Sequence, residues 1–247
     1  MPAVPADPWF VEAFREGYVR LYPHRDLSAA RREAGFLVAQ GLRGRVLDLC
    51  CGFGRHTLAM RESGIDAVGI DLSPELLAHA AGSPGWERLR GRILRGDART
   101  LPFAGASFGS VVNLFSSFGY FGEEGDKRVL LEIARVLAPG GFLAMDLMNP
   151  AFVRARLVPF SRTERGGARL VESRSLQAGG RLVVKDVELQ NESGTLRWRE
   201  EVRLYEPEEL LRWLDAAGFR QRAAFGDFDG SPLGESSPRQ LVMSQRI

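Results

Sequence analysis

Cysteine is almost absent from this chain, which has 247 residues and only two cysteines. They are neighbours, Cys50 and Cys51, and no third cysteine exists for either to pair with. The sequence therefore has neither a disulfide framework nor a four-ligand zinc pattern, and we expect no metal site. Small, reduced and buried thiols are typical of a cytoplasmic protein, which is the location we expect.

Long apolar runs and a strong charge of one sign are also missing. No apolar run approaches the roughly 20 residues that span a bilayer, and the first residues lack the basic stretch and apolar core of a signal peptide. We therefore expect no membrane partner. The net charge is only +2, which disfavours a dedicated nucleic-acid-binding protein. One local group of arginines is interpreted as solvated surface, with an acidic substrate or RNA as the alternative: Arg88, Arg90, Arg92, Arg95 and Arg99.

What the chain does contain is a regular alternation of strand and helix patterns from residue 44 to residue 148. Nearly continuous apolar runs are typical of a parallel sheet that is covered on both faces. The predicted fold class is therefore a doubly wound α/β core. The predicted strands are Arg45–Cys50, Asp66–Ile70, Arg92–Arg95, Gly109–Leu114 and Gly141–Leu147, and the predicted helices are Arg55–Ser63, Pro74–Ala80 and Asp126–Val136.

The periodicity changes after Pro150. Between Arg169 and Tyr205 it is closer to two, and glycine-rich breaks separate the runs, which predicts an antiparallel β-meander. A helix at Pro207–Ala217 and two closing strands follow. We expect three parts: an N-terminal helical cap over residues 1–40, a core made of residues 41–150 and 206–247, and a meander insertion over residues 151–205.

The first predicted strand runs into two closely spaced glycines, Gly52 and Gly54, and a helical pattern follows at once. Glycine lacks a Cβ, so this loop lets a ligand approach the backbone closely. Thr57 replaces the third small residue of a dinucleotide fingerprint, and the G-K-[ST] of a phosphate-binding loop is absent. Asp48 at the entrance would repel a pyrophosphate but suits an ammonium or a sulfonium. The loop predicts a positively charged ligand without phosphate.

Two further carboxylates stand where the next two predicted strands end. Asp71 follows the second strand and can accept hydrogen bonds from both hydroxyls of a ribose. Asp97 follows the third strand and can accept a hydrogen bond from an exocyclic amine such as adenine N6. Taken singly, each residue has an alternative interpretation as a turn or cap residue. Together with Asp48, at the ends of three successive strands, they favour an adenosine site.

This constellation resembles the class I S-adenosylmethionine-dependent methyltransferases over nearly the whole chain. The matching segments are residues 48–54 (first motif), Asp71 (ribose-binding acid), residues 96–98 (adenine side), residues 113–121 (fourth strand) and residues 137–141 (turn before strand five). One departure is Cys50, which stands where many members have the first glycine of the loop. The sequences of residues 48–56, 116–121 and 226–230 resemble those of a subgroup of small methyltransferases (type 11/25-like), which is related to enzymes acting on small molecules.

The resemblance implies a Rossmann-like seven-stranded mixed sheet of order 3-2-1-4-5-7-6, with the antiparallel meander inserted between strands 5 and 6. It implies S-adenosyl-L-methionine as the cofactor and S-adenosyl-L-homocysteine as its product. The residues expected to bind the cofactor are Tyr18, Arg31, Asp48, Cys50, Gly52, Gly54, Arg55, His56, Asp71, Leu72, Asp97, Ala98, Asn113 and Phe115. The residues expected to bind the substrate are Ser117, Tyr120, Tyr22 and Trp198.

The reaction implied by the resemblance is an in-line displacement at the sulfonium methyl group, in which positioning of the acceptor and desolvation supply most of the catalysis. No compelling general base stands out, so the catalytic residues are unknown, with His56, Asn113 and Tyr120 as candidates. The predicted acceptor is a small molecule. An RNA or protein methyltransferase and a non-catalytic cofactor-binding protein remain alternatives. The insertion is interpreted as a lid or as the contact surface of a homodimer.

Overall fold

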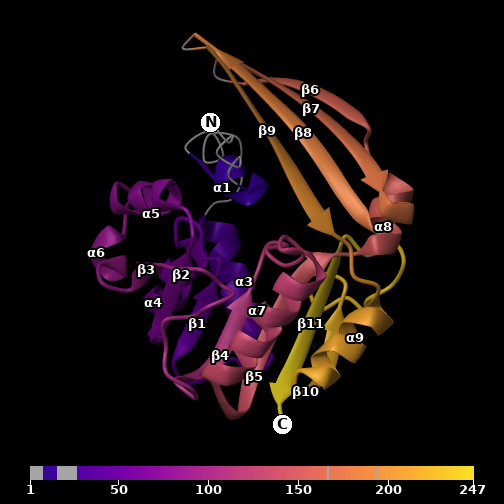
Figure 1. The fold of residues 1–247 in the computed structure, drawn as a ribbon. Helices are drawn as coiled ribbons and strands as arrows, with labels where there is room; N and C mark the ends of the chain where they lie inside the picture. Colours follow the sequence, from indigo (N-terminus) through magenta and orange to yellow (C-terminus); the bar gives the residue numbers. More distant parts are fainter. Residues whose placement is uncertain (1–7, 16–26, 166, 193) are drawn as a thin grey trace, which may run out of the picture.

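A computed structural model describes residues 8–15, 27–165, 167–192 and 194–247 of the chain. In this described part, a seven-stranded mixed sheet has the order β10-β11-β5-β4-β1-β2-β3 (Figure 1). Strands β1 to β5 pair in parallel, whereas β11 pairs antiparallel with both β5 and β10. The bounds are β1 (Val46–Leu49), β2 (Ala67–Asp71), β3 (Ile93–Arg95), β4 (Phe108–Asn113), β5 (Leu137–Met148), β10 (Phe219–Phe225) and β11 (Arg239–Arg246). Since β10 and β11 are the last two strands of this sheet along the chain, the predicted order 3-2-1-4-5-7-6 is confirmed.

Both faces of this sheet are covered because successive side chains of a strand point to opposite faces. Val46 packs in a cluster with α3 and α4, while its neighbour Leu47 packs in a second cluster with α7 and α9. The side chains of strand β4 divide in the same way, with Val111 in the cluster of Leu47 and Val112 in the cluster of Val46. The helices around the sheet are α3 (Leu27–Ala39), α4 (Arg55–Glu62), α5 (Pro74–Ala81), α6 (Trp86–Leu89), α7 (Gly122–Val136) and α9 (Pro207–Ala216).

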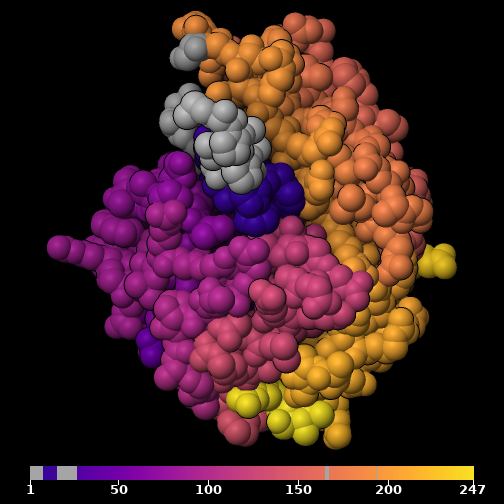
Figure 2. Space-filling model, in the orientation of Figure 1, coloured from indigo at the N-terminus to yellow at the C-terminus, as the bar shows by residue number. Residues whose placement is uncertain are grey.

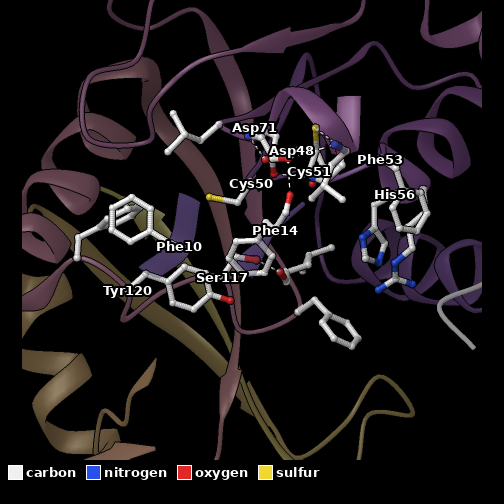
Figure 3. Close-up of a pocket in the computed structure, with 18 residues that line it drawn as sticks. Phe10, Phe14, Asp48, Cys50, Cys51, Phe53, His56, Asp71, Ser117 and Tyr120 are labelled. Carbon is white, nitrogen blue, oxygen red and sulfur yellow. Dashed lines mark hydrogen bonds between the residues drawn. The ribbon is translucent and has the colours of Figure 1, made fainter. Parts of the chain in front are cut away.

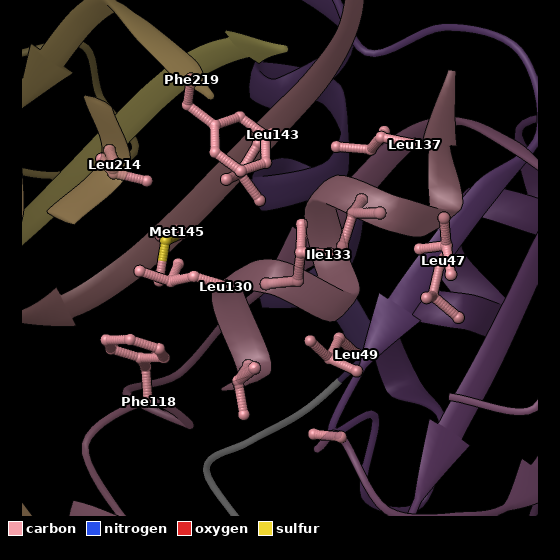
Figure 4. Close-up of a cluster of buried hydrophobic side chains, with 14 of the residues drawn as sticks. Leu47, Leu49, Phe118, Leu130, Ile133, Leu137, Leu143, Met145, Leu214 and Phe219 are labelled. Carbon is pink, nitrogen blue, oxygen red and sulfur yellow. The ribbon is translucent and has the colours of Figure 1, made fainter. Parts of the chain in front are cut away.

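Helix α7 supplies much of the larger cluster (Figure 4). Its buried residues Val129, Leu130, Ile133 and Val136 follow helical spacing and so form one apolar stripe. Ile133 is fully buried. Fully burying one such aliphatic side chain stabilises a fold by about 1.5–3 kcal/mol, so this stripe fixes α7 against the sheet.

A second, four-stranded antiparallel sheet is also found in the described residues, with the order β6-β7-β8-β9. It extends from the core above α8 (Pro150–Arg156), and α1 (Trp9–Ala13) lies between it and the core (Figures 1 and 2). Its bounds are β6 (Phe160–Arg165), β7 (Ala168–Gln177), the short 3₁₀ turn η1 (Ala178–Gly180), β8 (Leu182–Asn191) and β9 (Gly194–Arg203). The predicted meander is therefore present.

Several elements differ from the sequence expectation. Helices α6 and α8 and strand β6 were not predicted, although Asn149 and Pro150 carry the signal for α8: the Asn149 side chain accepts a hydrogen bond from the N–H of Ala151. Strand β5 begins at Leu137 rather than at residue 141, because the chain pairs with Phe108 before an irregularity in register. The division into a cap, a core and an insertion that are distinct domains stays a prediction.

Candidate active site

A cavity of about 830 Å³, its open mouth included, lies where strands β1, β2 and β4 end (Figure 3). The glycine loop after β1 and the first residues of α4 form one side of it. Residues 71–73 after β2 and the loop after β4 form two more sides, and Phe10 and Phe14 close it from the N-terminal end of the chain. The carboxyl ends of the parallel strands in a doubly wound sheet are where such folds bind ligands.

The glycine loop contains three residues in the left-handed conformation. They are Cys50, Gly52 and Gly54, with φ values of 61°, 57° and 79°. A Cβ at Gly52 would meet its nearest neighbour at an ordinary distance of 3.8 Å, so the backbone angle, and not crowding, favours glycine there. Cys50 adopts the left-handed conformation without being glycine, and its side chain lines the cavity. This is a conformation that glycine would adopt without strain.

Two carboxylates on the floor of the cavity are held by short hydrogen bonds. Asp71 accepts from the N–H of Gly52 at 2.8 Å and from the N–H of Ser73 at 2.9 Å. Each of its oxygens keeps a second lone pair for a ligand hydroxyl. Asp48 is 2% exposed and accepts from the Thr57 hydroxyl at 2.6 Å. Burial raises the pKa of both carboxyls, and these hydrogen bonds oppose the rise.

Arg55 and His56 begin helix α4 and line the same cavity. His56 Nε2 lies 2.5 Å from a carboxylate oxygen of Glu33, and the Arg55 guanidinium lies 3.3 Å from the same oxygen. Burial raises the pKa of Glu33, but the hydrogen bond with His56 and the nearby positive charges lower it to about 2. Sequence reasoning missed Glu33. Its signal was spacing, since it shares the face of α3 that buries Ala30 and Leu37.

Aromatic rings form the remaining wall of the cavity. Tyr120, in the loop after β4, stacks on Phe14 with ring centroids 5.7 Å apart and meets Trp9 edge-on at 4.9 Å. Phe10 meets Phe121 edge-on at 4.9 Å. The Ser73 hydroxyl also donates a hydrogen bond to the Phe14 carbonyl at 2.5 Å. Helix α1 is thereby fixed over the cavity by contacts with both flanking loops.

Sequence and structure comparisons place this geometry among known proteins. A family model described as a methyltransferase domain matches residues 46–141. The demethylmenaquinone methyltransferase of Deinococcus radiodurans is 31% identical over 182 residues, which cover 72% of this chain and 68% of that protein. The chain belongs to the class I S-adenosylmethionine-dependent methyltransferases. The demethylmenaquinone methyltransferase of Thermus thermophilus is 36% identical over 47% of this chain. The chain spans about half of that protein's length, at 52%.

The fold is likewise that of this methyltransferase family. The solved structure of SAM-bound CalS10, an amino pentose methyltransferase from Micromonospora echinaspora, has a TM-score of 0.68 at 22% identity. The match covers 94% of this chain and 97% of CalS10, so it includes the inserted sheet as well as the core. At this identity the likeness concerns the fold.

Many of the residues expected to bind the methyl donor line the cavity, as do two of the expected substrate residues, Ser117 and Tyr120. The cofactor-binding candidates found there are Asp48, Cys50, Gly52, Arg55, His56, Asp71, Leu72 and Phe115. Tyr18 and Tyr22 lie outside the described residues. Trp198 does not line the cavity. Neighbouring residues of a strand point to opposite faces, so Trp198 lies on the face of β9 opposite to Glu201 and Arg203, and its indole N–H donates to Glu200.

The other cofactor-binding candidates do not line the cavity. Arg31 is half exposed and pairs with Glu62 on the surface. The Asp97 carboxylate binds the Arg99 guanidinium through two nitrogens, and this hydrogen bonding lowers the pKa of Asp97. Ala98 is buried in the larger apolar cluster, and Gly54 is the N-cap residue that precedes α4.

Asn113 is fully buried at the end of β4. Its amide donates to the Leu49 carbonyl at 3.2 Å, which ties β4 to β1. Among the described residues, no group of three or more histidines, cysteines, aspartates or glutamates could hold a metal ion. No helix within the described ranges is both long enough and apolar enough to cross a membrane.

Proposed function

We propose that this protein transfers a methyl group from S-adenosylmethionine to a small-molecule acceptor. The observation that carries the proposal is the Asp71 carboxylate, which the backbone of Gly52 and Ser73 fixes at the edge of a cavity walled by aromatic rings. The bound cofactor supplies a methyl group that its sulfonium already activates. The protein has to position the acceptor and exclude water.

The donors and acceptors that line the cavity fit this cofactor. We propose that Asp71 accepts from the ribose hydroxyls and that the Asp48 carboxylate balances the positive charge of the cofactor's ammonium and sulfonium groups. Arg55, with the His56 imidazole beside it, is the group placed to bind the cofactor's carboxylate, since both residues line the cavity and Arg31 does not. The adenine-side role of Asp97 and Ala98 stays a prediction, because neither lines the cavity.

A second cavity adjoins the first across Tyr120 and supports a small polar acceptor. It measures about 870 Å³ with its open mouth and lies between α1 and the inserted sheet. Its walls carry charges of both signs, from Arg181 and Arg203 and from Glu123 and Glu201. Relatives named for demethylmenaquinone and for an amino pentose also act on small molecules, and the charged walls here favour a polar acceptor over an apolar one.

The aromatic side chains around Tyr120 have two proposed tasks. They keep water from the reacting methyl group, and their ring faces favour the positive charge of the sulfonium. Tyr120, His56 and Asn113 remain the candidates for a catalytic role. The His56 imidazole is already engaged by Glu33, and Asn113 is buried behind the cavity, which leaves Tyr120 as the candidate that faces both cavities.

Calorimetric titration with S-adenosylmethionine and S-adenosylhomocysteine tests the cofactor assignment. We expect the wild type to bind both and Asp71→Ala to lose about a hundredfold in affinity, as for a lost charge-assisted pair of hydrogen bonds. Transfer of labelled methyl groups to a metabolite extract, but not to total RNA or protein, is the expected acceptor result. Absence of binding by the wild type would contradict the proposal, and labelling of RNA or protein would contradict the acceptor class.

The arginine group near residue 90 gives little support to an RNA acceptor. Arg92 pairs with Asp66, Arg95 donates to the Leu72 carbonyl and Arg99 is held by Asp97. Each of these three exposed or half-exposed side chains is engaged by a neighbouring group at the surface. A cytoplasmic location and a homodimer through the inserted sheet remain part of the proposal, and size-exclusion chromatography with light scattering tests the latter.

A further inference from the structure

The loop that follows β4 begins with two consecutive strained residues. Phe115 and Ser116 have positive φ, at 64° and 56°, and neither is glycine. For residues other than glycine this conformation is unfavourable and persists only where surrounding contacts impose it. Phe115 and Ser117 both line the proposed cofactor cavity. The strain therefore lies in the segment that forms one wall of the site.

Asp146, on β5, holds both strained residues. Its carboxylate accepts from the N–H of Phe115 at 2.9 Å, and its backbone carbonyl accepts from the N–H of Ser116, also at 2.9 Å. Asp146 is 1% exposed and does not line the cavity. The same carboxylate oxygen receives the Arg239 guanidinium at 2.6 Å. A buried carboxylate of this kind is retained only when it is paired and hydrogen-bonded.

The side chain of Phe115 is held by the same group of residues. The Arg239 guanidinium lies 5.6 Å from the centre of its ring, and the Arg55 guanidinium lies 5.1 Å from it. Both distances fall within the range of a favourable cation–π contact. Arg55 in turn is paired with Glu33. The backbone and the ring of Phe115 are thus fixed by residues from α3, α4, β5 and β11.

We propose that Asp146 and Arg239 are positioning residues for methyl transfer. They hold Phe115 and Ser116 in the left-handed conformation, so that Phe115 and Ser117 present a fixed wall to the methyl donor. This inference rests on the proposed function. It assigns a role to two residues that stand behind the site and do not contact the ligand.

The decisive variant is Asp146→Asn, which keeps the shape and an acceptor but removes the negative charge that holds Arg239. We expect its affinity for S-adenosylmethionine, measured by calorimetry, to fall about tenfold, the size of one weakened charge-assisted contact. Asp186→Asn makes the same change in an exposed ion pair of the insertion and serves as the matched control. We expect the control to bind as the wild type does.

A second substitution separates positioning from overall stability. Ser116→Gly relieves backbone strain, so in the Asp146→Asn background we expect it to raise the melting temperature but to leave the affinity low. Recovery of affinity together with the melting temperature would overturn the inference, because the effect would then be one of stability alone. Equal affinity of Asp146→Asn and the wild type would overturn it as well.

If Asp146→Asn does not fold, Arg239→Lys provides the same test, since it keeps the charge but loses the planar fork of the guanidinium. We expect a smaller loss of affinity, about threefold to fivefold, at an unchanged far-ultraviolet circular dichroism spectrum. Unchanged affinity in this folded variant would overturn the inference. Failure of the wild type itself to bind the cofactor would instead contradict the proposed function.

Discussion

The cavity end of the core sheet and the exposed face of the inserted sheet place charge differently. In the core, Asp48 and Asp146 are at most 2% exposed, and each is held by hydrogen bonds near the cavity. In the insertion, Asp186 and Glu188 pair with arginines on the surface, where the arginine side chains are 53% and 69% exposed. The core therefore keeps these carboxylates buried, Asp146 with Arg239 as its ionic partner, whereas these two pairs of the insertion lie at the surface. One other ionic group of the insertion, Lys185 with Glu172 and Glu200, is itself largely buried.

This difference bears on what the charges of each sheet contribute to stability and to the proposed site. A buried charge lowers stability unless it is paired and hydrogen-bonded. Exposed pairs are screened by water and contribute little to stability. We propose that Asp48 and Asp146, with Arg239 beside Asp146, serve the proposed cofactor site. The exposed pairs of the insertion keep a projecting sheet compatible with water.

The largest effect is expected from Glu33→Gln, which removes a buried negative charge from His56 and Arg55. Because the pKa of Glu33 is lowered from its usual 4.5 to about 2, its ionised form stabilises the fold above pH 4.5, and this contribution is lost as the pH falls towards 2. We expect the variant to be about 2 kcal/mol less stable at pH 7. Urea titrations at pH 7 and at pH 3 measure the difference.

The pH dependence provides the internal control for this variant. The gap in unfolding free energy between Glu33→Gln and the wild type should narrow at pH 3. A gap of equal size at both pH values would mean that the glutamate acts through packing and not through its charge. We also propose that Glu33 orients Arg55 and His56 for the ligand, so we expect the variant to bind S-adenosylhomocysteine more weakly than the wild type does. Tighter binding would contradict this role.

A smaller effect, with opposite sign, is expected from Cys50→Gly. Cys50 has a φ of 61°, and glycine removes the strain of that conformation, so we expect a gain of up to about 1 kcal/mol and a melting temperature higher by about 2 °C. Differential scanning calorimetry measures the shift. Cys50→Ala removes the thiol without relieving the backbone, so an equal gain in that variant would rule out strain as the cause.

The core could be predicted from the sequence because its strands are covered on both faces and read as nearly continuous apolar runs. The strand order, the glycine loop and the positions of Asp48 and Asp71 at strand ends followed from that pattern and from the family resemblance. The start of α5 also follows a local signal, because Ser73 precedes Pro74 and its hydroxyl accepts from the N–H of Leu76 at 3.1 Å. Local sequence signals and burial agree in this region, so its secondary structure could be predicted from the sequence.

What the sequence could not reveal depends on contacts between distant segments. Glu33 reads as a polar residue of a surface helix until α3 is placed against α4. The ion pair of Asp97 with Arg99 is a local contact, but the sequence alone does not show that the guanidinium turns towards this carboxylate. The partnership of Asp146 with the loop after β4 joins residues thirty-one positions apart in sequence, and no local pattern announces it.

The smallest effect is expected in the insertion, where Glu188→Gln makes the same chemical change as Glu33→Gln. The hydrogen bond from Arg197 lowers the pKa of Glu188, but the pair lies in water, where screening cancels most of its benefit. We therefore expect the melting temperature and the affinity for S-adenosylhomocysteine to match those of the wild type. A clear loss of stability would mean that the exposed pairs hold the insertion together. A loss of affinity without a loss of stability would instead extend the binding site onto the inserted sheet, and the contrast between the two sheets would fail.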